Sequence, residues 1–212
     1  MFKDKEEFFR EILSDTLTAI DVLHEDRTSS FNRRMFVRAI FAGAEGITHL
    51  LKTWSLGFAN ENPGQYTIGE IALLREESYE LDRTGTKVKS RSKFVPTAKN
   101  FRFAVVSFMK FDPDFKFDSG GQGWESFKEA LAIRNRITHP KKVSDLQIDD
   151  DELDTCIDAH QWLIHSSFAC LIDYMKHLYK HSASAGIRRE MPDQLRELER
   201  SLSRLRNSDQ SS

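Results

Sequence analysis

An arginine, an asparagine and a histidine lie within six positions of one another in this chain, as Arg134, Asn135 and His139. A guanidinium group binds a phosphate or a carboxylate through two parallel hydrogen bonds, and an imidazole exchanges a proton near neutral pH. Positions 135 and 139 are four apart and share a helix face, whereas Pro140 disfavours helical backbone at His139. The spacing predicts a phosphate-binding and proton-transfer site at the C-terminal end of a helix.

The helix that would carry this site is predicted from the apolar residues before it. They recur at helical spacing, and the stripe can be continued through Trp124, Phe127, Leu131, Arg134 and Thr138. This pattern places the arginine where a core side chain is expected. Because an unpaired buried charge costs several kcal/mol, we expect the guanidinium group to contact an acid, a backbone carbonyl or an anionic ligand.

A second predicted helix, Asn32–Phe58, carries a stripe of polar residues. The stripe consists of Arg38, Glu45, His49 and Lys52, at spacings of 7, 4 and 3. It is either the solvent-exposed face of the helix or the wall of the cleft that contains Arg134. Glu45 is the natural candidate to neutralise Arg134 when no anion is bound, so Arg38 and Glu45 are second-tier candidates for substrate binding.

Further basic residues could contact phosphates. Arg136 and Lys141 lie beside the motif and are also second-tier candidates for substrate binding. No acidic residue occurs between Asp82 and Asp112, whereas this interval contains eight basic residues: Arg83, Lys87, Lys89, Arg91, Lys93, Lys99, Arg102 and Lys110. The interval either follows a phosphate backbone or is a solvated surface that balances the acidic segment 145–158.

The composition is typical of a soluble globular protein. Hydrophobic residues make up 39% of the 212 residues and charged residues 30%, so the chain can bury a proper core. No apolar run approaches the roughly 18 residues that a membrane span requires, and the charged N-terminus is unlike a signal peptide. Cys156 and Cys170 fall in one predicted helix, too far apart to pair. These features predict a cytoplasmic protein with free thiols and no membrane segment.

Periodicity along the chain predicts an all-α bundle with one small β-hairpin insertion. Alternating residues around the glycine-containing turn 82–86 predict strands at 78–81 and 87–90. Helical periodicity, helix starts and helix breakers predict helices at 3–23, 32–58, 67–77, 96–111, 124–138 and 153–181, and a last one from Pro192. We expect one helical domain over residues 1–185, followed by a C-terminal amphipathic helix and polar tail over residues 186–212.

Arg134, Asn135 and His139 resemble the ribonuclease motif of the HEPN family (higher eukaryotes and prokaryotes nucleotide-binding domain). That motif is an arginine, a polar residue and then a histidine a few residues further on. The surrounding segments, from about residue 30 to about residue 180, look like the arrangement in stand-alone bacterial members. The resemblance therefore implies a HEPN-like helical bundle.

The resemblance also implies an activity. HEPN ribonucleases act as dimers whose motifs face each other across the interface, and many relatives belong to toxin–antitoxin or antiphage systems. In this chain Arg134 would hold the scissile phosphate, His139 would move protons, and Asn135 would orient the histidine or the phosphate. RNA and a second copy of the chain are the expected partners, an antitoxin or regulatory protein is a further candidate, and no metal or cofactor is expected.

The chemistry of RNA cleavage favours the dimer as well. Without a metal, the reaction needs a base for the 2′-hydroxyl proton, an acid for the leaving 5′-oxygen and positive charge around the phosphorus. One motif supplies one histidine, whereas a two-fold dimer supplies two. Two alternatives stay open: a non-catalytic nucleic-acid- or nucleotide-binding dimeric HEPN module, and a purely structural helical partner protein.

Overall fold

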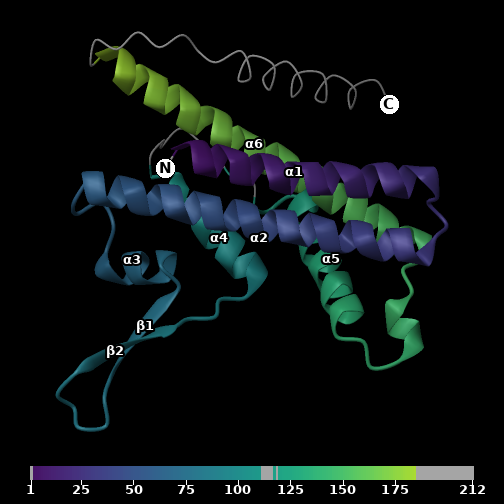
Figure 1. Ribbon diagram of the computed structural model, residues 1–212, viewed down its shortest axis with the longest axis horizontal. Helices are drawn as coiled ribbons and strands as arrows, with labels where there is room; N and C mark the ends of the chain where they lie inside the picture. Colours follow the sequence, from purple (N-terminus) through teal and green to yellow (C-terminus); the bar gives the residue numbers. More distant parts are fainter. Residues whose placement is uncertain (1, 111–116, 118, 185–212) are drawn as a thin grey trace.

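The computed structural model describes the backbone of residues 2–110, 117 and 119–184, and their side chains except those of 2–7, 9, 10, 12, 13 and 168–184. Within that part of the chain, one two-stranded antiparallel sheet accompanies the helices. In chain order (Figure 1) the elements are α1 (Phe2–Glu25), α2 (Ser30–Glu61), α3 (Ile68–Leu74), β1 (Glu77–Leu81), β2 (Val88–Ser92), α4 (Thr97–Phe108), α5 (Gln122–Thr138), the 3-10 turn η1 (Val143–Leu146) and α6 (Asp150–Ser184). The predicted all-α class with one β-hairpin is confirmed.

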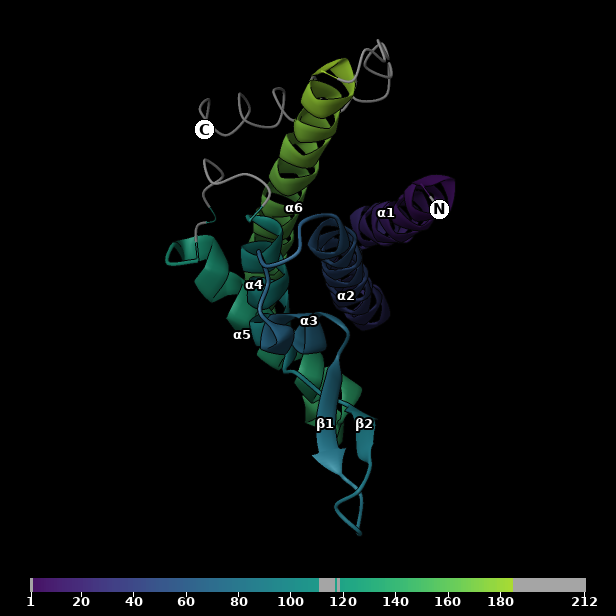
Figure 2. The ribbon, with the colours of Figure 1, turned by 90° about the vertical axis from the view of Figure 1, so that its left-hand side faces the viewer.

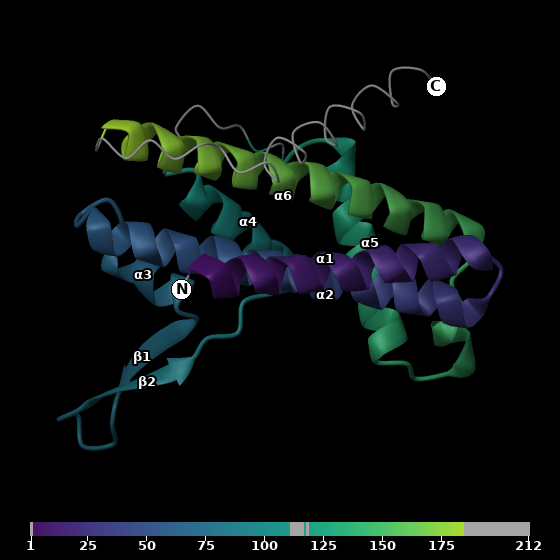
Figure 3. The same cartoon turned by 45° about the horizontal axis from the view of Figure 1, so that its top comes forward.

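Helix α2 is the central element of the bundle. It begins after Ser29, whose hydroxyl group accepts a hydrogen bond from the backbone N–H of Asn32 at 3.3 Å, as is typical of a helix N-cap. It packs against α1, α4 and α5, and α5 packs in turn against α6. Figures 1 and 3 show α1 and α2 side by side and antiparallel. The long central helix therefore connects the N-terminal helix to the helix that carries the motif.

Aromatic side chains from four helices form the centre of the core. Phe41 of α2, Phe101 of α4 and Phe127 of α5 are fully buried, and the ring centroid of Phe127 lies 5.5 Å from each of the other two. Trp162 of α6 joins this cluster through contacts with Phe127 and Trp124, both with ring centroids 5.5 Å apart. Aromatic pairs at such separations add to the stabilisation from burial, so this cluster fixes how α5 packs against its neighbours.

The β-hairpin projects from the bundle on the side of α3 (Figures 1 and 2). Its register runs from the pair Glu77–Ser92 to the pair Leu81–Val88. Asp82 fixes the turn, because its carboxylate accepts hydrogen bonds from the backbone N–H groups of the two residues that lead into β2, at 3.0 and 3.3 Å. Every residue of β2 is exposed. Both faces of the outer part of the hairpin are therefore exposed to solvent.

One prediction about α5 is wrong. The buried stripe of this helix continues from Ala130 to Ile133 and Ile137, and not to Arg134 and Thr138. Thr138 is exposed, and the side chain of Arg134 keeps 25% of its accessible surface at the edge of the stripe. The reason is that helical spacing permits a step of three or four at each turn, and burying a branched apolar side chain is favourable whereas burying a charge is costly.

Several predicted boundaries shift. Helix α3 ends at Leu74 instead of residue 77, because Glu76 takes a positive φ of 56° that a helix cannot contain. Helix α4 ends at Phe108, and α6 begins at Asp150, three residues before Leu153. The helix predicted from residue 192 and the segment 186–212 lie outside the described residues. No helix among the described residues is long and apolar enough to cross a membrane.

Candidate functional site

The three motif residues occupy the end of α5. The helix ends at Thr138, and His139 follows it with φ −122° and ψ 57°, outside the helical region. The backbone N–H of His139 still donates a hydrogen bond to the carbonyl oxygen of Asn135 at 3.1 Å. The expectation that Pro140 moves His139 out of the helix is therefore confirmed. Its side chain is exposed at the end of the helix.

Arg134 is paired with Glu45, as the sequence predicts. Its Nη2 atom donates a hydrogen bond to Oε1 of Glu45 at 2.8 Å, and its Nη1 atom donates to Oδ1 of Asn135 at 3.2 Å. The side chain of Glu45 is 51% exposed, so water screens the ion pair. Exposed pairs of this kind stabilise a protein by about 0 to 1 kcal/mol. The guanidinium group is thus held in place by contacts that an incoming phosphate can replace.

Asn135 and His139 lie on an exposed face of α5. Lys128 and Ala132 precede them on the same face, at spacings of four and three, and are exposed as well. The side-chain oxygen of Asn135 accepts a hydrogen bond from Arg134. The small side chain of Ala132 leaves room for close approach of another helix, since helix separation depends on the side chains at the contact.

Arg136 and Lys141 differ in their surroundings. Arg136 is turned toward α6, where its guanidinium group donates to both carboxylate oxygens of Glu152 at 2.6 and 2.7 Å, and to the carbonyl oxygen of Gln147 at 2.8 Å. These contacts join the end of α5 to the start of α6. The Lys141 side chain is exposed, and its backbone N–H donates to Asp145 at 2.8 Å. That hydrogen bond is the main reason that the pKa of the Asp145 carboxyl group is lowered.

The polar stripe of α2 divides into exposed and buried members. Arg38 and His49 are exposed, as Glu45 is. Lys52 is only 3% exposed, and its Nζ atom donates to Oε1 of Glu76 and to Oδ1 of Asn100, both at 2.9 Å. The hydrogen bond from Lys52 is the main cause of the lowered pKa of the Glu76 carboxyl group. The stripe is therefore a solvent-exposed face at one end and part of an internal polar network at the other.

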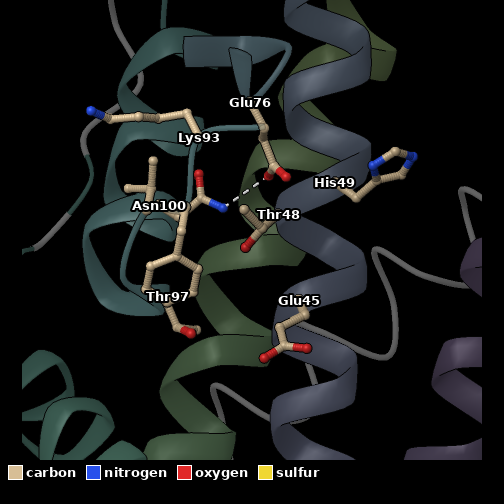
Figure 4. Close-up of a pocket in the computed structure, with 9 residues that line it drawn as sticks. Glu45, Thr48, His49, Glu76, Lys93, Thr97 and Asn100 are labelled. Atoms are coloured by element: carbon tan, nitrogen blue, oxygen red, sulfur yellow. Dashed lines mark hydrogen bonds between the residues drawn. The ribbon is translucent and has the colours of Figure 1, made fainter. Parts of the chain in front are cut away.

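A cavity of about 380 Å³ lies beside Glu45, between α2, the root of the hairpin and the first turn of α4 (Figure 4). Figure 4 shows Glu76 and Asn100 hydrogen-bonded to each other opposite Thr48, whereas His49 points away from them. The sequence did not predict this cavity, because its walls come from segments far apart in the chain. The nearest signal in the sequence is Phe94, one of several phenylalanines between Asp82 and Asp112.

Two other titratable groups that could do chemistry lie away from the surface: Cys156 is buried and His160 is half-buried. Burial raises the pKa of the Cys156 thiol to about 12, so the reactive thiolate is disfavoured at neutral pH. Burial lowers the pKa of His160 to about 4, which keeps this imidazole uncharged at neutral pH. Its ring lies against Phe36, with the ring centroids 5.9 Å apart. The exposed end of α5 is the better candidate for a reactive site.

No protein-family model matches this chain, and no curated protein or solved structure shows significant similarity to it. What the site does is therefore inferred from its own geometry and from the likeness of Arg134, Asn135 and His139 to the HEPN motif.

Proposed function

We propose that this chain is a metal-independent endoribonuclease of the HEPN type, in which the 2′-hydroxyl of RNA attacks the adjacent phosphate at a site shared by two copies. The observation that carries the proposal is the arrangement at the end of α5. Arg134 is held in place by Glu45, and the exposed Asn135 and His139 lie in the last turn of α5 and directly after it. A phosphate-binding group and an imidazole are therefore accessible within six residues of each other at the end of α5.

Each residue has a role that its surroundings support. The guanidinium fork of Arg134 exchanges the Glu45 carboxylate for the scissile phosphate, and its charge stabilises the negative charge that develops on the phosphorane. His139 transfers a proton, because its exposed imidazole can reach a substrate and can act as a general acid or base. Asn135 contacts Arg134 and keeps two amide N–H donors for the phosphate or for a histidine.

The proposed dimer follows from the single histidine of the motif. A two-fold axis beside the exposed face of α5 brings together two copies of Arg134 and two of His139. One imidazole then accepts the 2′-hydroxyl proton and the other donates a proton to the leaving 5′-oxygen. The stripe Lys128, Ala132, Asn135, His139 is the surface we assign to this contact.

The experiment that tests the proposal is gel analysis of RNA incubated with the purified chain in EDTA. Wild type should cleave and leave 2′,3′-cyclic phosphate ends, because the attacking group belongs to the substrate. His139→Ala and Arg134→Ala should each slow cleavage by about 100- to 10,000-fold. The matched controls are His24→Ala and Arg27→Ala, which remove the same side-chain types at exposed positions near the end of α1 and outside the basic interval.

Three results would overturn parts of this proposal. Cleavage that requires Mg²⁺, or that survives His139→Ala undiminished, refutes the assigned chemistry. A fully active monomer in a sedimentation measurement refutes the shared site. In that case His49, one helical turn from Glu45 on α2, becomes the candidate for the second proton-transfer group.

A non-catalytic nucleic-acid- or nucleotide-binding dimer is the second candidate. The exposed basic residues of the hairpin favour it, because they can contact phosphates without any proton transfer. RNA binding by wild type without cleavage would select this function over the first.

The biological setting that we propose comes from the HEPN likeness alone. It is a toxin–antitoxin or antiphage role in the cytoplasm, where cleavage of host or phage RNA stops growth. An antitoxin or regulatory protein would then restrain the enzyme.

A further inference from the structure

The cavity at the root of the hairpin has the size and the walls of a binding site. Its volume of about 380 Å³ falls within the range of about 300 to 1,000 Å³ that is typical of small-ligand sites. Glu45 and Thr48 of α2 line one side, and Glu76 and Asn100 line the other (Figure 4). Phe94, which follows β2, completes the wall.

A buried lysine holds the polar wall of this cavity in place before any ligand binds. Lys52 is almost fully buried and binds both Glu76 and Asn100. Asn100 also donates to Oε1 of Glu76 at 3.2 Å. The backbone of Glu76 is strained, with φ at 56°, and its carbonyl oxygen accepts a hydrogen bond from the N–H of Lys93 at 2.6 Å. Residues held in such backbone regions persist only where their surroundings fix them, often at ligand sites.

The side chains that remain open at the cavity match the chemistry of a nucleotide. Phe94 is 85% exposed, so its ring is a free surface on which a base can stack. The neighbouring Lys93 is exposed and carries a positive charge for a phosphate. Thr97 adds a hydroxyl group, and Asn100 keeps one amide N–H beyond its bond to Glu76; both can contact the edge of a base. An aromatic face, a cation and hydrogen-bonding groups together are how proteins bind single-stranded RNA.

Glu45 connects this cavity to the motif. Its carboxylate lines the cavity and also binds Arg134 at 2.8 Å. We infer that the cavity binds one nucleobase of single-stranded RNA, stacked on Phe94, next to the phosphate that Arg134 holds. Lys93 contacts the backbone of the same nucleotide. This inference rests on the proposed RNA substrate, but it does not require that the RNA be cut.

The inference is tested by RNA binding in a His139→Ala background, where the RNA stays intact. The probe is a short fluorescein-labelled single-stranded RNA, and the readout is fluorescence anisotropy. Phe94→Ala should weaken binding by about 5- to 150-fold, the effect of losing one stacked base. Phe94→Trp should retain the affinity, because it retains an aromatic face, whereas Phe94→Leu should lose it.

The matched control is Ile68→Ala. Ile68 is 86% exposed, close to the exposure of Phe94, but it lies on α3 and does not line the cavity. This variant should bind RNA as the background protein does. Circular dichroism should show the same helicity for all variants, because neither side chain is buried.

Binding that is equal in Phe94→Ala and Ile68→Ala would overturn the base site, and so would full rescue by Phe94→Leu. Cleavage by the chain with its native His139, measured in parallel, separates the two proposals. If that chain does not cut RNA but binding depends on an aromatic residue at position 94, the base site stands and the ribonuclease proposal fails. If the chain cuts RNA but binding is insensitive to position 94, the ribonuclease proposal stands and the base site fails. A chain that binds no RNA overturns both.

Discussion

Replacing Glu45 by glutamine should tighten RNA binding, because the carboxylate competes with phosphate for Arg134. In the free protein Oε1 of Glu45 accepts a hydrogen bond from the guanidinium group at 2.8 Å. A phosphate that binds Arg134 must displace this carboxylate and then remain near it. Glu45→Gln keeps the size of the side chain and its oxygen acceptor, and removes only the negative charge.

The magnitude follows from the exposure of the pair. Two negative charges about 5 Å apart repel by roughly 1 kcal/mol in water and roughly 3 kcal/mol at an effective dielectric constant of 20. The Glu45 side chain is 51% exposed, so the lower value applies. We therefore expect RNA to bind about five-fold more tightly, since each 1.4 kcal/mol is a factor of about ten. Loss of the ion pair should lower the free energy of unfolding by no more than about 1 kcal/mol.

Fluorescence anisotropy with labelled single-stranded RNA measures this change in a His139→Ala background. The matched control is Glu61→Gln, which removes the same charge from the C-terminal end of the same helix. At 1.5 Å per residue, position 61 lies about 24 Å from position 45 along α2. This separation exceeds the Debye length of about 8 Å at physiological salt, so the control should leave the affinity unchanged.

Unchanged or weaker binding by Glu45→Gln would refute the competition. Weaker binding would mean that the carboxylate positions Arg134 for the phosphate. Equal gains in Glu45→Gln and Glu61→Gln would mean that only the net charge of the chain matters.

Three further predictions concern the hairpin, the core and the pH dependence of stability. Exchanging Lys87 and Lys89 for serine should make the slope of log affinity against log salt shallower by about 0.7 for each lost phosphate contact, and an unchanged slope would mean that this part of the hairpin only faces solvent. Gly123→Ala should lower the free energy of unfolding by about 1 to 3 kcal/mol, because the new Cβ would lie 2.2 Å from the ring of Trp162; urea denaturation measures this loss. The pKa of His160 is about 4 in the folded chain and about 6.5 when unfolded, so the unfolded chain takes up a proton first as the pH falls. His160 therefore leaves the free energy of unfolding unchanged above about pH 6.5 and lowers it by up to about 3 kcal/mol as the pH falls toward 4. His160→Gln should remove this part of the loss, as measured by urea denaturation at several pH values.

Sequence patterns correctly predicted the features that are determined by residues close together in the chain. The alternation around the turn 82–86 predicted the hairpin, and β1 and β2 differ from the prediction by only one or two residues at their ends. Pro140 predicted that His139 leaves the helix, because a proline ring clashes with helical backbone at the preceding residue. The contact between Glu45 and Arg134 was predicted from charge alone, since a partly buried guanidinium group needs an acceptor.

The cavity could not be predicted, because it depends on contacts between distant segments. Lys52 binds Glu76 and Asn100, which are 24 and 48 residues further along the chain. A lysine in a polar stripe is normally exposed, whereas this one is 3% exposed and binds residues from two other segments. The positive φ of Glu76 is equally invisible in the sequence, since a non-glycine residue rarely adopts it.

Arg134 and Arg136, at the end of α5, differ in how firmly their neighbours hold them. The two residues are two positions apart, so at about 100° per residue their side chains leave the helix in nearly opposite directions. Arg136 makes three hydrogen bonds to the loop before α6 and to its first turn, and a ligand would have to replace all three. Arg134 makes one hydrogen bond to Glu45 and one longer one to Asn135. A ligand has to replace every hydrogen bond that it displaces. Arg134 is therefore the arginine that can bind a phosphate without loss of the contacts that hold the end of α5 against α6.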